Sequence, residues 1–274
     1  MTEPGAIHTP RYGPIIGRGN TAEVYASGER EVVKLFRVGT PEAMVAGEFR
    51  SAGIAADAGI ATPKPLRRVE IDGRMGIVFE RVDGPAMLDV LGKQPWKLRS
   101  WARELSRLEH TLARTASVTE RTVKEYLRPK LLNAEMAADV REMLVSRLDR
   151  LPDGDALVHL DFHPGNVLIG PSGPVIIDWS NTSVGDPAAD VGQTLLILEC
   201  ASAPEGTKLS LPVRLGRRAF RSAARAEAFR LDPSLKLRVD DWMPVLAGAR
   251  LAERNRGERE PLLYVIAEHM RRLR

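Results

Sequence analysis

The spacing of apolar residues divides the chain into two stretches of different character. Up to residue 82 it predicts short strands, two or three of them within residues 11–36 around a glycine-rich turn. Two more are expected at Leu66–Ile71 and Met75–Val82, where the intervening Asp72-Gly73 is a strong β-hairpin signal. Between these groups, Pro41–Ala58 has a helical pattern.

From residue 83 onward the pattern is mainly helical, and apolar residues recur every three or four positions from Pro95 to Leu112. Only residues 156–179 break this rhythm, with short strands expected at Val167–Ile169 and Val175–Asp178. Further helices are expected at 119–127, 133–149, 187–200, 210–229, 240–254 and 261–273. The chain is therefore predicted to be an α+β protein. Its N-terminal lobe, residues 1–82, is a β-sheet plus a helix, and its C-terminal lobe, residues 83–274, is mostly helical.

Composition excludes several classes of protein. The single cysteine, Cys200, rules out an intrachain disulfide and a cysteine metal site, and it fits a reducing cytoplasm. No signal-peptide pattern follows Met1, and no run approaches the ~20 apolar residues of a membrane helix. We therefore expect a cytoplasmic protein with no membrane partner, while its oligomeric state cannot be predicted.

Charge is unevenly distributed along the chain. The net charge is +4, but residues 201–274 hold 16 Lys or Arg against 9 Asp or Glu, a local net of +7. Either a nucleic-acid face or solvated helix faces could produce this excess. The basic residues alternate with Ala and Leu at helical spacing, and no groove-reading or base-stacking motif accompanies them, so no nucleic-acid partner is expected.

Candidate chemistry begins in the segment from Gly17 to Val24, which has the pattern Gly-x-Gly-x-x-Ala-x-Val. Glycines between two strands let the backbone approach phosphates closely, and exposed amide hydrogens can point at the anion. A dinucleotide-binding loop would require a helix directly afterwards. Here Val24-Tyr25-Ala26 is expected to be strand, which excludes that class. Taken alone, the segment is also compatible with a simple hairpin turn.

Lys34 lies inside the apolar run Val32–Phe36. Burying an unpaired ammonium group is costly, so Lys34 needs either an anionic partner or an edge position with access to water. Glu48, in the predicted helix, is the first candidate partner and Glu42 is the second. Nucleotide phosphates would serve as additional partners.

The strongest candidate group lies in residues 158–179. Asp161 and Asn166 are five residues apart on a loop, and Asp178 ends the following strand. Amide and carboxylate oxygens, shared with phosphate oxygens, suit Mg²⁺. Asp161 would then orient and deprotonate an attacking hydroxyl.

Two histidines near this loop raise the alternative of a zinc site. His159 and His163 are four residues apart, as on a zinc-binding helix, but Pro164-Gly165 follows directly and prevents a helix. His159 is instead expected to pack and hydrogen-bond beneath the loop.

Together these segments resemble the aminoglycoside phosphotransferase and choline kinase-like family, relatives of the protein kinases. The resemblance extends from about Ile16 to Asp190, and its most specific parts are HLDFHPGNVLI, residues 159–169, and IIDW, residues 176–179. It implies a bilobal protein-kinase-like fold with the catalytic loop within residues 156–190. It also implies a small-molecule kinase that uses ATP or GTP with Mg²⁺.

Position by position, the resemblance implies Asp161 as catalytic base and Asn166 and Asp178 as Mg²⁺ ligands. Lys34 would contact the α- and β-phosphates and pair with Glu48. The remaining nucleotide-binding positions are Gly17 and Gly19 over the phosphates, the hinge Glu80-Arg81-Val82, and the base-contacting Ile16, Val24, Val32, Leu168 and Ile177. Supporting roles fall to His159 and to Asp186 and Asp190 of a GDPxxD segment, in which Asp190 braces the catalytic loop.

Two departures from protein kinases narrow the expected substrate. Leu160 stands where a protein kinase has Arg before the catalytic Asp, and only seven residues separate Asp178 from Asp186. This interval leaves no room for an activation loop. A peptide substrate is therefore not expected.

The acceptor is not identified by the resemblance. Enzymes for polycationic aminoglycosides tend to line the acceptor site with carboxylates, but the surrounding segment here is net basic. The leading hypothesis is an antibiotic-type acceptor and a role in antibiotic resistance. The alternatives are a housekeeping kinase for choline, homoserine or a sugar, and a nucleotide-binding pseudoenzyme. The candidate acceptor carboxylates are Glu199, Asp240, Asp241, Glu253 and Glu258.

Overall fold

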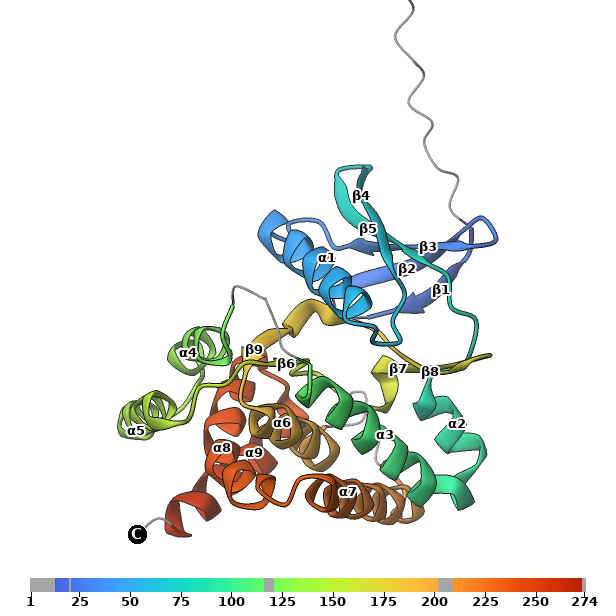
Figure 1. The fold of residues 1–274 in the computed structure, drawn as a ribbon. Coiled ribbons are helices and arrows are strands. Elements are labelled where there is room, and N and C mark those ends of the chain that lie inside the picture. Colours follow the sequence, from blue (N-terminus) through green and yellow to red (C-terminus); the bar gives the residue numbers. More distant parts are fainter. Residues whose placement is uncertain (1–12, 20, 116–120, 202–208, 273–274) are drawn as a thin grey trace, which may run out of the picture. The chain divides into compact units, whose positions relative to one another are not determined.

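The computed structural model describes residues 13–19, 21–115, 121–201 and 209–272 (Figure 1). Several positions with sequence expectations lie outside the described residues: 11–12 of the first strands, Asn20 of the glycine-rich segment, 119–120 of an expected helix, and residue 273. The chain divides into two compact units. Unit 1 comprises the chain up to Gly84 together with Leu168–Ser180, and unit 2 comprises Pro85–Val167 with Asn181–Arg274.

Unit 1 is built on a five-stranded antiparallel sheet in the order β1-β2-β3-β5-β4. Its strands are β1 (Ile15–Arg18), β2 (Ala22–Ser27), β3 (Glu31–Phe36), β4 (Pro65–Ile71) and β5 (Arg74–Glu80), and its helix is α1 (Glu42–Asp57). The turn between β4 and β5 has φ of 51° at Asp72 and 72° at Gly73, as the expected Asp-Gly hairpin requires.

Strand β3 is buried on both faces of this sheet, which explains its continuous apolar run. Phe36 packs with Val45 of α1 on one face, while Val33 and Leu35 pack with Val78 on the other. Lys34 points to the same face as Phe36, with its ammonium 5.4 Å from that ring centroid. A charged side chain is thereby held within the packed layer between sheet and helix.

Residues 168–180 cluster with the sheet, although the sequence analysis assigned them to the helical lobe. They contain β8 (Gly173–Ile176), which pairs with β7 (Val167–Gly170), and they lead into the short 3₁₀ turn η3 (Trp179–Asn181). The Ile176 amide donates to the Ala61 carbonyl at 2.8 Å, and the Trp179 indole donates to Thr62 Oγ1 at 2.8 Å. These bonds tie the segment to the chain that follows α1.

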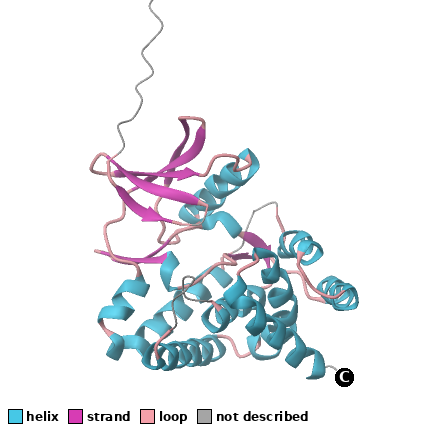
Figure 2. Ribbon diagram, turned by 180° about the vertical axis from the view of Figure 1, so that it is seen from behind, coloured by secondary structure: helices cyan, strands magenta, loops and turns pink. Residues whose placement is uncertain are grey.

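Unit 2 is mostly helical, as the contrast of helix and strand colours in Figure 2 shows. One large core joins its helices and includes Leu131, Leu148, Leu196 and Trp242. Two short strands, β6 (Ala156–Val158) and β9 (Ser183–Gly185), pair beside it. The helices are α2 (Met87–Lys93), α3 (Leu98–Ala113), α4 (Val123–Asn133), α5 (Ala138–Arg150), α6 (Pro187–Cys200), α7 (Leu211–Leu231), α8 (Leu235–Arg250) and α9 (Arg256–Arg272), with 3₁₀ turns η1 (Pro95–Lys97), η2 (Pro164–Asn166) and η4 (Leu251–Glu253).

Two helices of unit 2 have other boundaries than expected, and both contain a proline that does not end the helix. Helix α4 starts after Thr122, which forms a capping box with Glu125, and it continues through Pro129 to Asn133. Helix α8 starts five residues before the expected position and contains Pro244. Burial of apolar side chains on both sides of these prolines outweighs the lost backbone hydrogen bond.

The α+β class with an N-terminal sheet and a mainly helical remainder is confirmed. Among the described residues, no helix is both long enough and apolar enough to span a lipid bilayer.

Candidate active site

Lys34 is the centre of a buried charge cluster in unit 1. Its ammonium lies 2.6 Å from Glu48 Oε1 and 3.0 Å from Asp178 Oδ1, and its side chain is 11% exposed. Burial acts to lower the pKa of Lys34, but the charges of Glu48 and Asp178 outweigh it and raise that pKa. The structure thus brings Lys34 together with its first candidate partner. Glu42 instead lies 3.3 Å from Arg68 at the surface.

Glu48 is the most deeply buried member of this cluster, with a side chain 1% exposed. Burial raises the pKa of Glu48, and the ammonium of Lys34 opposes that rise. Its Oε1 binds Lys34, whereas Oε2 is buried and has no hydrogen-bond partner among the described residues. Such a carboxylate depends on Lys34 for its charge to be tolerated.

Asp178 has a strained backbone, with φ of 67°. The Ser180 hydroxyl donates to its Oδ1 at 2.9 Å, and the same oxygen accepts from Lys34. Its side chain is 33% exposed, so the carboxylate is held by the protein and also open to a ligand. Strain of this kind, supported by neighbouring bonds, is typical of functional positions. Ser180 was not among the predicted site residues, because only the turn after β8 brings it back onto Asp178.

The glycine-rich segment forms the turn between β1 and β2. Gly17 is paired with Val24, and the Gly19 amide donates to the Ala22 carbonyl at 2.9 Å. Neither Gly17 nor Gly19 has a left-handed φ, and a Cβ at either would meet only ordinary contacts at 3.5 Å or more. The fold itself therefore does not require glycine at these positions. The absence of a side chain at both positions lets another molecule approach the backbone closely.

The predicted hinge and base-contacting positions also lie in unit 1. The Arg81 amide donates to the Arg30 carbonyl at 2.8 Å, which extends the sheet beyond Glu80. A Cβ at Gly84 would collide with the carbonyl oxygen of Ile169, so the chain past Val82 runs close against β7. The predicted base contacts Val24, Val32, Leu168 and Ile177 are half-buried, and Ile16 is exposed.

The predicted catalytic loop lies in unit 2 and is held by Asp190. The backbone amides of His159 and Leu160 donate to the two carboxylate oxygens of Asp190, at 2.9 and 2.7 Å. Leu160 has a φ of 59°, a strained value for a side chain that is 1% exposed. Asp190 therefore offsets the strain that turns the next residue, Asp161, out of the strand direction.

Asp161 and Asn166 are joined within this loop. Asn166 Nδ2 donates to the Asp161 carbonyl at 2.9 Å and to its Oδ2 at 3.3 Å. The side chain of Asp161 is 31% exposed, and its Oδ1 lies 3.9 Å from His163 Nε2. Because both bonds use the nitrogen of the Asn166 amide, its oxygen is oriented away from Asp161.

The supporting residues occupy structural positions. His159 is fully buried, accepts from the Asp161 amide at 3.3 Å and meets the Phe162 ring edge-on. Asp186 caps α6 through the Ala188 amide at 2.9 Å and accepts from the Trp242 indole at 3.0 Å. His159 and Asp186 thus hold the two ends of the segment that contains the catalytic loop.

A second buried carboxyl group near Asp190 was not predicted from the sequence. Glu109 of α3 accepts from Thr194 Oγ1 at 2.5 Å and is 2% exposed. Burial and the nearby Asp190 raise the pKa of Glu109 well above the usual value. Its pattern in the sequence is that of an ordinary helix residue, and only tertiary packing shows its burial.

The candidate acceptor carboxylates are mostly paired with arginine or lysine. Glu199 lies 2.5 Å from Arg221 and Glu258 lies 2.6 Å from Arg250. Glu253 is 3.2 Å from Lys130. These groups therefore do not form a set of carboxylates ready to receive a polycation.

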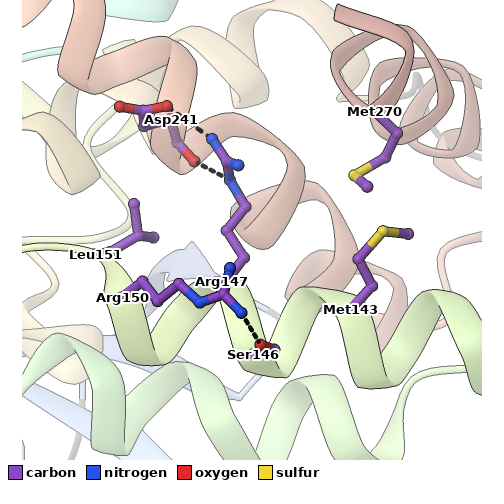
Figure 3. Close-up of a pocket in the computed structure, with 7 residues that line it drawn as sticks. All are labelled: Met143, Ser146, Arg147, Arg150, Leu151, Asp241 and Met270. Carbon is purple, nitrogen blue, oxygen red and sulfur yellow. Dashed lines mark hydrogen bonds and ion pairs between the residues drawn. The ribbon is translucent and has the colours of Figure 1, made fainter. Parts of the chain in front are cut away.

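Asp241 belongs to a pocket of about 540 Å³ formed by α5, α8 and α9 (Figure 3). There Asp241 is bound by Arg147 at 2.7 Å, and Arg150 donates to Ser146 at 3.1 Å. The pocket also contains Met143, Leu151 and Met270. Asp240, the remaining candidate, is half-buried.

The residues proposed for Mg²⁺ fit that ion chemically. Asp178 offers a partly exposed carboxylate. Asn166 offers its amide oxygen, because only its amide nitrogen is used in the bonds to Asp161. Both groups are hard oxygen donors. Among the described residues, no group of three or more His, Cys, Asp or Glu side chains could hold a metal alone. Two protein ligands with phosphate oxygens completing the shell are the usual arrangement for nucleotide-bound Mg²⁺.

Solved structures of known proteins are similar to this fold. A search of curated proteins gave no match. One similar solved structure is a thermostable mutant of aminoglycoside phosphotransferase APH(4)-Ia in ternary complex with ADP and hygromycin B. It has a TM-score of 0.62 and 14% identity, covering 95% of this chain and 92% of that one. Amicoumacin kinase hAmiN, in complex with AMP-PNP, Ca²⁺ and Ami, has a TM-score of 0.58 and 15% identity, covering 93% and 87%. A choline/ethanolamine kinase family protein from Mesorhizobium loti has a TM-score of 0.51 and 20% identity, covering 97% and 88%.

The family assignment rests on a family model rather than on these low identities. The model described as "Phosphotransferase enzyme family" matches residues 14–229, which is most of the chain and contains every predicted catalytic, nucleotide-binding, metal-binding and supporting residue. The chain therefore belongs to the phosphotransferase enzyme family and is an ATP-dependent small-molecule kinase of the protein-kinase-like fold.

Proposed function

We propose that the enzyme transfers the γ-phosphate of ATP or GTP to an alcohol group of a small molecule, with Asp161 as the base. The observation that carries this proposal is the contact of buried Lys34 with both Glu48 and Asp178. Burying the ionised Lys34 and Glu48 is costly, and the strained, partly exposed Asp178 adds to that cost. A cluster of this kind is explained by a triphosphate that binds Lys34 and a cation that binds Asp178.

In this proposal unit 1 supplies the nucleotide contacts. The turn containing Gly17 and Gly19 accommodates the phosphates, and Lys34 neutralises part of their charge. The purine lies against the half-buried apolar positions, with hydrogen bonds from the hinge backbone at Glu80–Val82. Bound Mg²⁺ would add charge neutralisation at the β- and γ-phosphates, with Asp178 and Asn166 as its protein ligands.

Unit 2 supplies the group that acts on the acceptor. The acceptor oxygen attacks the γ-phosphorus, the bond from that phosphorus to the β-bridging oxygen breaks, and ADP leaves. The acceptor proton passes to the carboxylate of Asp161, which Asn166 orients through its side-chain nitrogen. Asp190 supports this geometry from behind, because it binds the two amides before Asp161.

The acceptor class within this reaction is either an antibiotic or a metabolite. Hydroxylated antibiotics are favoured because structural neighbours include an amicoumacin kinase and a phosphotransferase bound to hygromycin B. A metabolite acceptor has support from the choline/ethanolamine kinase family neighbour. The first of these options would give the enzyme a role in antibiotic resistance, and we propose a cytoplasmic location as well.

A coupled assay of ADP or GDP release tests the proposal directly. The purified enzyme is mixed with ATP or GTP, Mg²⁺ and a panel of aminoglycosides, other hydroxylated antibiotics, sugars and amino alcohols. Acceptor-dependent turnover that disappears in Asp161→Asn is the expected result. Tight nucleotide binding with no acceptor-dependent turnover across the panel would instead support a nucleotide-binding pseudoenzyme.

A further inference from the structure

The imidazole ring of His163 lies against the backbone of its own turn in unit 2. The Gly165 amide donates to His163 Nδ1 at 3.0 Å, and the Asn166 amide donates to the His163 carbonyl at 2.8 Å. A Cβ at Gly165 would lie 2.7 Å from Cε1 of this ring, closer than a Cβ normally comes to another atom. Gly165 does not have a left-handed φ, so a larger residue there would disturb the position of the ring rather than the backbone conformation.

These contacts determine which ring nitrogen carries the hydrogen. A ring nitrogen that accepts a hydrogen bond from an amide uses its lone pair and has no hydrogen of its own. Because Nδ1 accepts from Gly165, the hydrogen of the neutral imidazole is on Nε2. His163 is therefore a donor at Nε2, and neither nitrogen is available to take a proton from an acceptor hydroxyl.

The Nε2 donor of His163 faces Asp161. The distance from Nε2 to Asp161 Oδ1 is 3.9 Å, about 1 Å longer than a hydrogen bond. Hydrogen bonds of catalytic groups often reach their final length only in the complex with substrate. The two side chains are 30% and 31% exposed, so neither is locked in a packed core that would prevent a movement of about 1 Å.

A hydrogen bond from His163 would fix the orientation of the Asp161 carboxylate. Asn166 Nδ2 reaches Oδ2 at 3.3 Å and so holds one of its two oxygens. The last torsion of an aspartate side chain is broad, and a contact to one oxygen leaves the plane of the carboxylate able to rotate. A second donor at Oδ1 fixes that plane and leaves a lone pair on each oxygen for the acceptor hydroxyl. A neutral donor does this without a full positive charge, which would weaken the base.

We propose that His163 is a positioning residue for phosphoryl transfer. Its Nε2–H binds Asp161 Oδ1 and, together with Asn166 at Oδ2, directs the plane of the carboxylate toward the acceptor hydroxyl. The inference rests on the proposed function, because it takes Asp161 as the base. In the alternative, His163 only ties the loop together through its bond from Gly165.

Two substitutions separate the roles of the two ring nitrogens. His163→Asn keeps a side-chain oxygen that can accept from the Gly165 amide but has no group at the position of Nε2, whereas His163→Gln places an amide nitrogen near that position. We expect kcat for ADP release from magnesium–ATP to fall about 10-fold or more in His163→Asn, with the KM for ATP within about 2-fold. His163→Gln should recover most of this loss. Unchanged kcat in His163→Asn, or a loss confined to His163→Gln, would overturn the proposal and support the loop-tying role.

The rates are measured with water, hygromycin B and choline as acceptors. Water carries an O–H group, so slow transfer to water reports on Asp161 whatever acceptor the enzyme prefers. The matched control is His269→Asn on α9, where the ring contacts the Val265 carbonyl of the same helix at 2.9 Å. It should keep the original kcat.

Nitrogen NMR of the histidine side chains in the full-length protein tests the geometry without any acceptor. The His163 signals, identified by their absence in His163→Asn, should show the hydrogen on Nε2. Asp161→Asn should shift the Nε2 signal of His163 but not the signals of His269. A hydrogen on Nδ1, or an Nε2 signal that Asp161→Asn does not move, would overturn the proposal.

Failure of the proposed function is recognised separately, by ADP formation that persists in Asp161→Asn. Failure of this inference alone would leave Asp161→Asn inactive and His163→Asn at the original rate.

Discussion

Replacing Lys34 with methionine should destabilise the protein in a strongly pH-dependent way. The substitution removes the ammonium group but preserves most of the side-chain volume. It leaves Glu48, 1% exposed, without the ammonium group that lies 2.6 Å from its Oε1. Asp178 is 33% exposed and can be hydrated, so the cost falls mainly on Glu48.

Protonation of Glu48 sets an upper limit on the loss of stability in Lys34→Met. A buried carboxylate without a partner takes up a proton instead of remaining charged. Relative to an ordinary pKa of 4.5, holding that proton at pH 7 costs about 1.4 kcal/mol for each of 2.5 pH units, or about 3.5 kcal/mol. At pH 5.5 the same cost is about 1.4 kcal/mol. Because a raised pKa on an acid means that the folded state binds the extra proton, stability is lost as pH rises above 4.5.

Urea unfolding without nucleotide at pH 5.5 and pH 7 measures this difference. Lys34→Met should lose about 2 kcal/mol more of the free energy of unfolding at pH 7 than at pH 5.5, relative to the unmodified protein. Adding Glu48→Gln to Lys34→Met should recover most of the loss at pH 7. The control is Arg67→Met, which breaks an exposed pair with Glu31 and should cost less than about 1 kcal/mol at either pH. A loss that is the same at both pH values, or that Glu48→Gln does not relieve, would refute the reasoning.

Three further predictions concern the other buried or strained carboxyl groups. Asp178→Ala should weaken binding of the magnesium–nucleotide complex about 10-fold or more in a calorimetric titration, and unchanged affinity would contradict its assignment. Because burial and Asp190 raise the pKa of Glu109, stability should fall as pH rises above 4.5, and Glu109→Gln should flatten that slope by up to about 1.4 kcal/mol per pH unit in urea unfolding. An unaltered slope would show that the pKa of Glu109 is not raised in the folded protein. Asp190→Asn should lower kcat about 10-fold or more while nucleotide affinity stays within about 3-fold, because one oxygen that accepts a loop amide is replaced by a donor. Equal losses in kcat and affinity would point to general unfolding instead.

Much of the N-terminal sheet could be predicted because its signals are local. The Asp72-Gly73 turn determines the register of β4 and β5, and the apolar run around Lys34 marks a strand buried on both faces. The cost of burying Lys34 also led to Glu48, since a charge in such a strand needs a partner. In these cases a physical requirement of one residue restricts where another can be.

Features that depend on tertiary packing could not be predicted in the same way. Helix α4 passes through Pro129, and nothing in the local sequence shows that the core will compensate for this. The burial of Glu109 and the bond from Ser180 to Asp178 likewise depend on how distant segments pack. The sequence motifs are specific for phosphoryl transfer because the phosphate is the same in every reaction of this class. The acceptor varies from one reaction of this class to another, so the residues that contact it need not belong to any shared motif.

The most direct test of the central claim is the transfer of labelled γ-phosphate from ATP to an acceptor by the unmodified enzyme and by Asp161→Asn. Asparagine keeps the shape of the side chain and its contact with Asn166 but cannot accept the acceptor proton. We expect transfer to fall at least ~100-fold while nucleotide affinity in calorimetry stays within about 3-fold. Transfer by Asp161→Asn at near the original rate would contradict the assignment of Asp161 as the base.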